Sequence, residues 1–251
     1  IDFADKPEVR EAIRRDDYLV RPQLSVQADG GRRYVYNARV LDVVRQIPRG
    51  TIFDRNGLPL ATGDPALVAK SKDHYGDIGI TLARACADRD ERCYPLGGVA
   101  FHLLGDARTR LNWSASNTSY VERDREDRLR GFSDHAATVK TTDASGQTAY
   151  AVRRDYRDVI GLVRHRYEPE HPAAKAVLAR PRDLRLSLDA RLQIRVGSIL
   201  TRYASASKSG NAAAVVLDAT TGDILAAVSY PWPDLDALGE DRRDPRGLER
   251  Q

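Results

Sequence analysis

The stretch RGTIFDRNGLPLATGD, residues 49–64, contains two short apolar segments separated by a polar turn. The first segment holds Thr, Ile and Phe, which favour β-strands. Asn56 and Gly57 stand between the segments and tolerate positive φ, and such a pair closes a tight hairpin that matches the twist of its strands. The stretch therefore predicts a β-hairpin with charged residues at its shoulders, which are Arg49, Asp54 and Arg55.

The composition bounds the class of protein. The chain has 251 residues, of which 41% are hydrophobic and 30% charged, so it can bury a core and holds one large or two ordinary domains. Lys and Arg total 40 against 36 Asp and Glu, and the signs alternate, as in RDREDR at 123–128. Interleaved charges are typical of a solvated surface, so we expect no nucleic-acid partner despite the net charge of +4.

The segments before the middle of the chain give mixed signals. Residues 34–40 alternate in polarity and predict a strand. Residues 76–92 have helical spacing of apolar side chains and predict a helix. Residues 107–150 are polar and charged without strong periodicity, so we interpret them as an irregular lobe.

The C-terminal third is the most regular. We expect a helix or a helical turn over 151–167. A linker is expected over 168–183, because that segment contains three prolines. A strand over 184–188 precedes Asp189, a candidate N-cap. In the helix that follows, one apolar face is expected to consist of Leu192, Val196, Ile199, Leu200 and Tyr203, and the strands 212–218 and 223–230 come next.

The two cysteines, Cys86 and Cys93, leave two alternatives open. Across seven residues of intact helix their Cα atoms would lie about 10 Å apart, and a disulfide needs less than about 7 Å. Pro95 disfavours helix at Tyr94, so a helix that ends near Arg89 would let the chain turn back and form a disulfide. Otherwise both remain free thiols. The five histidines show no ligand spacing with the cysteines, so we expect no metal site and no cofactor.

Several stretches resemble one protein family in the order in which they occur. RRYVYNARVLDVVRQIPRGTIFDRNGLPLATGD (32–64) resembles the junction of the pedestal domain in class B penicillin-binding proteins. LRLSLDARLQIRVGSIL (184–200) and AAAVVLDATTGDILAAVSYPWPD (212–234) resemble the opening of the transpeptidase domain of that family. YPLGGVAFHLLGD and DYRDVIGLVRHR, between them, are similar to intervening segments. Together these stretches cover about half of the chain.

The resemblance implies an α+β fold. Residues 1–180 would form an elongated, strand-rich pedestal or dimerisation-type domain. Residues 184–251 would form the first part of an α/β transpeptidase domain, a helix and an antiparallel hairpin. A junction motif would join the two domains through charged hydrogen bonds. Its residues are Arg49, Gly50, Asp54, Arg55 and Gly57.

The resemblance also implies an activity for the parent protein. Members cross-link peptidoglycan stem peptides through a serine acyl-enzyme, and β-lactams inhibit them covalently. The nucleophile lies in a Ser-x-x-Lys motif, where the lysine one helical turn away can accept the hydroxyl proton. The sequence contains one such motif, Ser205 to Lys208, but it precedes the predicted strand pair, whereas the family motif follows it by tens of residues. We therefore expect no catalytic residue in this chain, and a nucleophile beyond Gln251.

Three alternatives follow for function. The chain is the scaffold portion of a D,D-transpeptidase, or an interaction module that docks and regulates a polytopic peptidoglycan glycosyltransferase, or an unrelated periplasmic binding protein. The first two place it on the periplasmic face of the bacterial cytoplasmic membrane, with an anchor expected before Ile1, since the sequence itself has no apolar run of membrane-spanning length. A homodimer of the fragment through bare strand edges is also an expectation.

Overall fold

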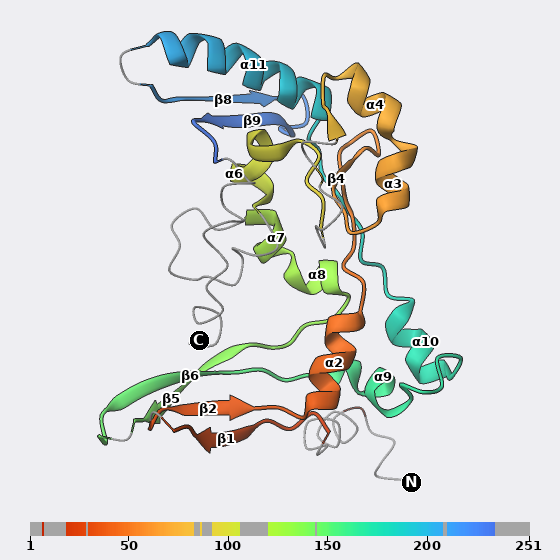
Figure 1. Ribbon diagram of the computed structural model, residues 1–251, viewed down its shortest axis with the longest axis vertical. Coiled ribbons are helices and arrows are strands. Elements are labelled where there is room, and N and C mark those ends of the chain that lie inside the picture. The colour runs from red at the N-terminus through yellow and green to blue at the C-terminus, as the bar shows by residue number, and fades with distance from the viewer. Residues whose placement is uncertain are drawn as a thin grey trace. The chain divides into compact units, whose positions relative to one another are not determined.

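A computed structural model gives the structure of the protein, which has a mixed α+β fold, as the sequence predicts (Figure 1). Its sheets are small, with two or three strands each. Within the part of the chain that the structure describes, no helix is long and apolar enough to cross a membrane. The described residues are 7, 19–28, 30–82, 86, 92–105, 120–143, 145–207 and 210–233.

The chain forms two compact units, each built from separate stretches. Unit 1 comprises residues up to Arg49 together with Arg130–Arg182, and unit 2 comprises Gly50–Leu129 together with the residues from Asp183 onward. The chain passes between the two units after residues 49, 129 and 182. The expected division into a pedestal over 1–180 and the start of a transpeptidase domain over 184–251 stays a prediction. Which function each stretch serves stays a prediction.

Unit 1 contains two antiparallel strand pairs. One is formed by β1 (Gln23–Val26) and β2 (Arg32–Val35), and the other by β5 (Ala137–Thr142) and β6 (Thr148–Arg153). Strand β2 lies beside β6. The irregular lobe expected over 107–150 is therefore wrong for its second half. Alternating Thr, Ala and Val build β5 and β6 without a strong apolar signal.

The helices of unit 1 depart from the expected pattern in two places. Of the strand expected over 34–40, only residues 34 and 35 are extended, as the end of β2, because Asn37 caps α2 (Ala38–Gln46) by accepting the N–H of Arg39 at 3.0 Å. The expected linker contains α10 (Pro172–Leu178), in which Pro172 occupies the first turn, where its missing N–H costs nothing. The other helical segments are η4 (Arg157–Val159) and α9 (Ile160–Arg164), and the helix expected from residue 151 thus begins later.

A single apolar cluster holds unit 1 together. It combines the segment before β1, helix α2 and the η4–α9–α10 region. Each member has less than a tenth of its surface exposed, so every one contributes the free energy of burying an apolar side chain. The buried members are Leu19, Val20, Val40, Val43, Ile47, Phe132, Tyr156, Val159, Val163 and Val177.

Unit 2 is organised around a three-stranded sheet in the order β4–β3–β7. Strands β3 (Ile52–Phe53) and β4 (Pro59–Ala61) form the predicted hairpin. Strand β3 also pairs in parallel with β7 (Leu184–Arg185), which lies much later in the sequence. Parallel partners require a long connection, and here the intervening chain supplies it.

Short helices flank this sheet in sequence. They include α3 (Pro65–Lys70), α4 (Lys72–Asp77), η2 (Gly97–Ala100), α6 (Phe101–Leu104), α7 (Tyr120–Asp124) and α8 (Glu126–Arg130). The helix expected over 76–92 is wrong at its start, because α4 ends at Asp77 and Gly79 follows with a φ of 81°. Most of its remaining length lies outside the described residues.

The last elements follow the prediction closely. Helix α11 (Ala190–Ala206) begins after Asp189, whose carboxylate accepts the N–H of Leu192 at 2.9 Å. Strands β8 (Ala212–Leu217) and β9 (Ile224–Tyr230) form an antiparallel hairpin that packs on α11. The predicted helix face is wrong in part, since Ile199 and Tyr203 are exposed. The residues that α11 buries are Ala190, Gln193, Gly197 and Ala204.

Candidate functional site

The hairpin at residues 52–61 is bound to the start of α11 through Asp54, which is 2% exposed. Its Oδ1 accepts the backbone N–H groups of Asn56 and Leu58, both at 2.8 Å, and so closes the turn. Its Oδ2 accepts the N–H of Ala190 at 3.2 Å. One buried carboxylate therefore ties two stretches separated by 136 positions in sequence.

The turn differs from the predicted one in its backbone. Gly57 has a φ of 88°, whereas Asn56 does not have a positive φ. A two-residue turn of the expected kind needs positive φ at both positions. Asp54 instead supplies the acceptor that shapes a wider turn, a recognised use of Asp side chains.

The other predicted junction residues each form hydrogen bonds with a different part of the chain. The N–H of Arg55 donates to the carbonyl of Leu188 at 2.8 Å, and Arg185 donates to the carbonyl of Arg55 at 3.4 Å. Gly50 pairs with the carbonyl of Leu129 at 2.8 Å. Arg49 belongs to unit 1, so the structure gathers four of the five predicted residues in unit 2. Their role as a functional junction stays a prediction.

A tyrosine supports the same hairpin from α4. Tyr75 is fully buried, and its hydroxyl donates to the carbonyl of Pro59 at 2.6 Å. Burial raises the pKa of Tyr75 strongly, and the negative charge of Asp54 raises it further. The phenol thus stays protonated and keeps its role as a donor.

A buried ion pair connects three further segments of unit 2. Arg92 Nε lies 2.5 Å from Glu122 Oε1, and the two side chains are 5% and 0% exposed. Arg92 also donates to the carbonyl of Gly50 at 3.0 Å, and the hydroxyl of Tyr94 donates to Glu122 at 3.1 Å. The carbonyl of Gly50 directly precedes the hairpin, so this pair fixes the point where the chain enters the sheet.

The cysteines lie near the same hairpin. Cys86 and Cys93 are joined by a disulfide, with Cα atoms 5.0 Å apart, so the structure takes one of the two alternatives that the sequence left open. Cys93 and Thr62 also exchange two backbone hydrogen bonds, of 2.7 and 3.0 Å. The disulfide therefore anchors residue 86 to the end of β4.

Gln193, in α11, also connects separate elements of unit 2 through hydrogen bonds of its side chain. Its side chain is fully buried, and its amide donates to the carbonyls of Val99 and Ala227 at 2.9 and 2.8 Å. Its carbonyl accepts the N–H of Ala227 at 2.9 Å. The glutamine thus pairs with β9 as a neighbouring strand residue would, and also holds η2 against the helix.

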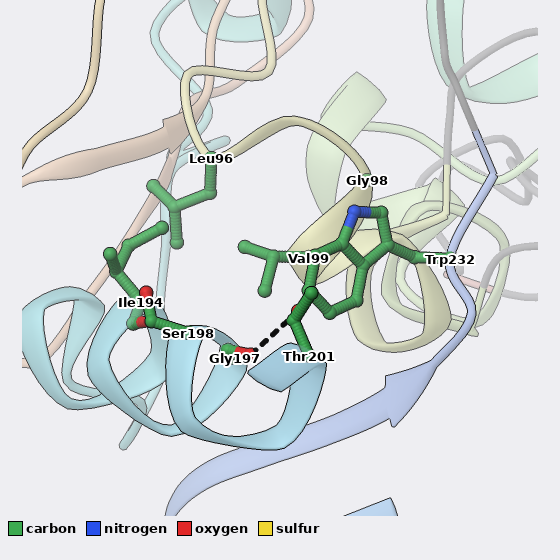
Figure 2. A pocket seen from close by; sticks show the side chains of 8 residues that line it. All are labelled: Leu96, Gly98, Val99, Ile194, Gly197, Ser198, Thr201 and Trp232. Atoms are coloured by element: carbon green, nitrogen blue, oxygen red, sulfur yellow. Dashed lines mark hydrogen bonds between the residues drawn. The ribbon is translucent and has the colours of Figure 1, made fainter. Parts of the chain in front are cut away.

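An open pocket lies between η2, α11 and the residues after β9 (Figure 2). Val99 and Trp232 face Ile194 across it, and Thr201 turns its hydroxyl to the carbonyl of Gly197 at 2.9 Å. A Cβ at Gly197 would come within 2.5 Å of Val99, so only glycine permits this approach. The lining contains no ionisable side chain, so it offers no acid, base or nucleophile of that kind.

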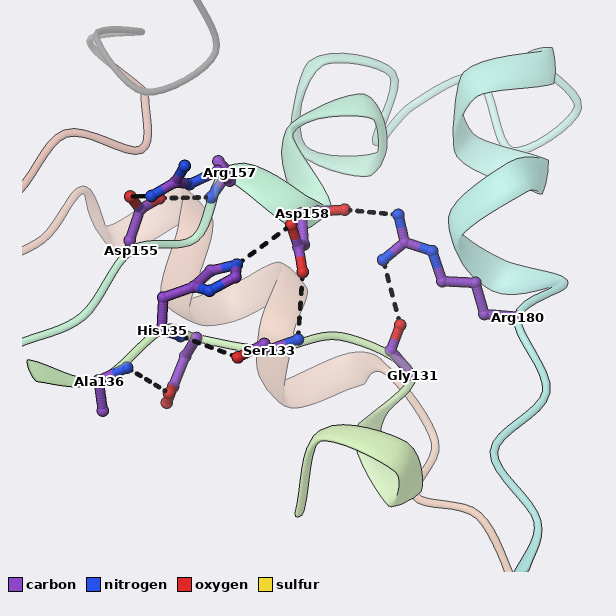
Figure 3. A network of polar contacts seen from close by, with 9 residues as sticks. Gly131, Ser133, His135, Ala136, Asp155, Arg157, Asp158 and Arg180 are labelled. Carbon is purple, nitrogen blue, oxygen red and sulfur yellow. Dashed lines mark hydrogen bonds and ion pairs between the residues drawn. The ribbon is translucent and has the colours of Figure 1, made fainter. Parts of the chain in front are cut away.

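Unit 1 contains a polar network that includes Ser133, His135 and Asp158 (Figure 3). His135 Nε2 lies 3.4 Å from Asp158 Oδ1, but the hydroxyl of Ser133 accepts the backbone N–H of His135 at 3.1 Å. A catalytic triad needs the hydroxyl bonded to the ring nitrogen. Arg180 joins the same network by donating to the carbonyls of Gly131 and Asp158. The network is therefore structural, fixing the loop before β5 to η4 and α10.

One carboxylate of this network has a shifted pKa. Burial alone would raise the pKa of Asp155, but hydrogen bonds from Arg157 outweigh it and lower the pKa below its usual range. The ion pair between Asp155 and Arg157 stabilises unit 1 above the ordinary pKa of an aspartate, and this stabilisation is lost as the pH falls through the lowered value.

The surroundings of the serine in the Ser-x-x-Lys motif do not favour catalysis. Ser205 lies in the last turn of α11, is exposed, and donates to the carbonyl of Arg202 at 3.4 Å. Lys208 lies outside the described residues. Sequence reasoning missed a different group, His165, Glu168 and His171, because it compared histidines only with cysteines. That group is the one cluster of potential metal ligands found among the described residues.

Comparisons with known proteins found similarity among solved structures alone. No protein-family model matches this chain, and no curated protein matches it. Among solved structures, the chain is similar to a penicillin-binding protein (PBP2) from Helicobacter pylori, with 15% sequence identity and a TM-score of 0.35. The match covers 76% of this chain and 43% of that one, so this chain spans less than half the length of the structure that it matches.

Proposed function

We propose that this chain is the non-catalytic scaffold portion of a peptidoglycan D,D-transpeptidase of the class B penicillin-binding type. One arrangement carries the proposal. The two stretches that carry the strongest resemblance meet in unit 2, where β3 pairs with β7 and Asp54 accepts the N–H of Ala190. A hairpin that joins a pedestal to the opening of a transpeptidase domain requires such a contact.

In the proposed parent, a serine outside these residues attacks the D-Ala–D-Ala peptide carbonyl, and the terminal D-Ala leaves as the acyl-enzyme ester forms. An amine of a second stem peptide then attacks that ester, which forms the cross-link and releases the serine. This chain would position that domain on the periplasmic face of the cytoplasmic membrane, where an anchored parent meets its substrate. A rigid support is useful for such chemistry, because small displacements of catalytic groups reduce rates strongly.

We expect this chain to form no covalent adduct with a penicillin. The only Ser-x-x-Lys motif in the sequence starts at Ser205, which is exposed and hydrogen bonded to its own helix. Intact-mass spectrometry after incubation with benzylpenicillin would give 27.9 kDa without an addition. An adduct that disappears in Ser205→Ala would contradict the scaffold proposal, and the Ser198→Ala variant serves as the matched control on the same helix.

We also propose a docking role for unit 1, toward a polytopic peptidoglycan glycosyltransferase. The supporting observation is an apolar face on β6, where Tyr150 and Val152 are 70% and 50% exposed. Their cross-strand partners on β5 are Lys140 and Thr138, so the same face carries one positive charge beside Tyr150. On β1, Leu24 and Val26 are also exposed.

Binding of the purified chain to an immobilised multi-pass glycan polymerase should be saturable and should weaken about tenfold in Tyr150→Asp, since a buried aromatic anchor typically contributes 1 kcal/mol or more. Tyr203→Asp, at an equally exposed tyrosine of α11, is the control and should bind as the parent chain does. Equal losses in the two variants, or no binding at all, would remove the docking role. That result would leave the scaffold proposal standing.

A further inference from the structure

The segment between α9 and α10 makes two successive tight turns. The N–H of Glu168 donates to the carbonyl of His165, and the N–H of His171 donates to the carbonyl of Glu168, both at 2.9 Å. Residues three apart in such turns lie on the same side of the backbone. The spacing His-x-x-Glu-x-x-His therefore places three potential ligands on one side of the segment.

The side chains of this cluster converge. Their ligating atoms all lie within 4.8 Å of one another. The rings of His165 and His171 stack at 3.3 Å with planes 4° apart. His165 Nδ1 lies 3.6 Å from Glu168 Oε2, and this nitrogen is inaccessible to solvent and has no hydrogen-bond partner among the described residues. Buried nitrogens are normally satisfied, and a bound cation would satisfy this one.

We propose that His165, Glu168 and His171 bind a zinc ion. Two imidazole nitrogens and one carboxylate oxygen form a donor set that zinc accepts, whereas magnesium and calcium prefer oxygen ligands throughout. Three protein ligands leave the fourth tetrahedral position to water. The site is independent of the proposed scaffold function.

The charges around the cluster permit a cation. Lys175 is paired with Glu170, and the guanidinium of Arg166 lies over the ring of Tyr167 at 4.3 Å. These neighbouring cations thus have anionic or aromatic partners of their own. Glu168 remains largely exposed and is free to turn toward an ion between the rings.

Zinc binding requires two local changes. A coordination bond lies in the plane of its imidazole, so the two stacked rings must open from their present angle. His171 Nδ1 now accepts the N–H of Ala173 at 3.2 Å. A neutral imidazole has only one nitrogen with a free lone pair, so binding through either nitrogen of His171 takes the acceptor from Ala173. The amide of Ala173 is therefore a specific reporter of binding.

The test is a titration of the untagged, metal-free full chain with zinc chloride alone, followed by calorimetry and by the amide signal of Ala173 in NMR. We expect one zinc ion per chain, a shift of the Ala173 signal and a higher melting temperature. Magnesium chloride should produce none of these. Absence of zinc binding at micromolar concentrations, or binding without any change at Ala173, would overturn the proposal.

Variants separate coordination from folding. In His171→Asn the new side chain still caps α10, since Asn is a favourable N-cap, but it removes one imidazole. This variant and Glu168→Gln each remove a direct ligand, so each should lose zinc affinity by at least the roughly 10- to 100-fold that removal of an outer-shell partner costs. His74→Ala, which removes an exposed histidine of α4, should bind zinc as the parent chain does. Unchanged affinity in His171→Asn would also overturn the proposal.

Discussion

Replacing Glu122 by alanine is expected to lower the free energy of unfolding of unit 2 by about 3–5 kcal/mol, the usual cost of breaking a buried ion pair from one side. Arg92 would keep its charge in a site where its side chain is 5% exposed. The hydrogen bond from Arg92 to the carbonyl of Gly50 would remain. Urea unfolding followed by circular dichroism would measure the loss.

Two comparisons make this prediction specific. Asp124→Ala removes a carboxylate that pairs with Arg123 at 3.1 Å on the surface, and should cost no more than about 0.5 kcal/mol. The double variant Arg92→Met with Glu122→Leu should recover much of the stability, because apolar residues can replace a buried pair. If Glu122→Ala is no worse than Asp124→Ala, the pair is not needed for unit 2.

Replacing Asp54 by alanine should destabilise unit 2 by about 2–4 kcal/mol, because buried N–H groups lose their acceptor at a cost of about 1–3 kcal/mol each. The buried N–H groups are those of Leu58 and Ala190. The N–H of Asn56 is only partly buried, so its loss of an acceptor costs less. Asp54→Asn should cost about half as much, since one oxygen can still close the turn while the amide faces the N–H of Ala190. Hydrogen exchange at the Ala190 amide would separate the two variants.

The matched control is Asp218, which closes the turn between β8 and β9. It accepts the N–H groups of Thr220 and Thr221 at 2.8 and 3.3 Å, as Asp54 does for its own turn, but both of these hydrogen bonds are exposed. Water can replace the acceptor there, so Asp218→Ala should have a much smaller effect. Equal losses at the two positions would mean that turn closure alone, and not the bond to Ala190, explains the role of Asp54.

The elements that could be predicted from the sequence are those marked by a pattern of neighbouring residues. Asp189 stands directly before the apolar periodicity of α11, and the strands β8 and β9 are continuous apolar runs separated by a turn at Gly222. The hairpin was recognised for the same reason. The side chain that closes the hairpin turn was not predicted, because the turn depends on the buried carboxylate of Asp54 rather than on Asn56.

The elements that were missed depend on distant partners or on weak patterns. In α2, Val40 and Val43 bury one helix face, but the residues before them alternate as in a strand, and only the cap at Asn37 marks the change. Strands β5 and β6 carry few large apolar residues, so their pairing had no clear signal. Arg92 and Glu122 stand 30 positions apart, and no local pattern connects them.

The residues of unit 2 at which the chain enters or leaves this unit, near 50, 129 and 183, are hydrogen bonded to one another. The N–H of Gly50 donates to Leu129, the N–H of Thr51 donates to the side chain of Asp183, and Arg128 donates to the carbonyl of Asp183 at 3.3 Å. The ends of the 130–182 stretch are thus held close together by their neighbours in unit 2. In evolutionary terms the 130–182 stretch and the residues up to Arg49 share one core, so they would have to diverge together, while the sheet of unit 2 can keep its own hydrogen bonds.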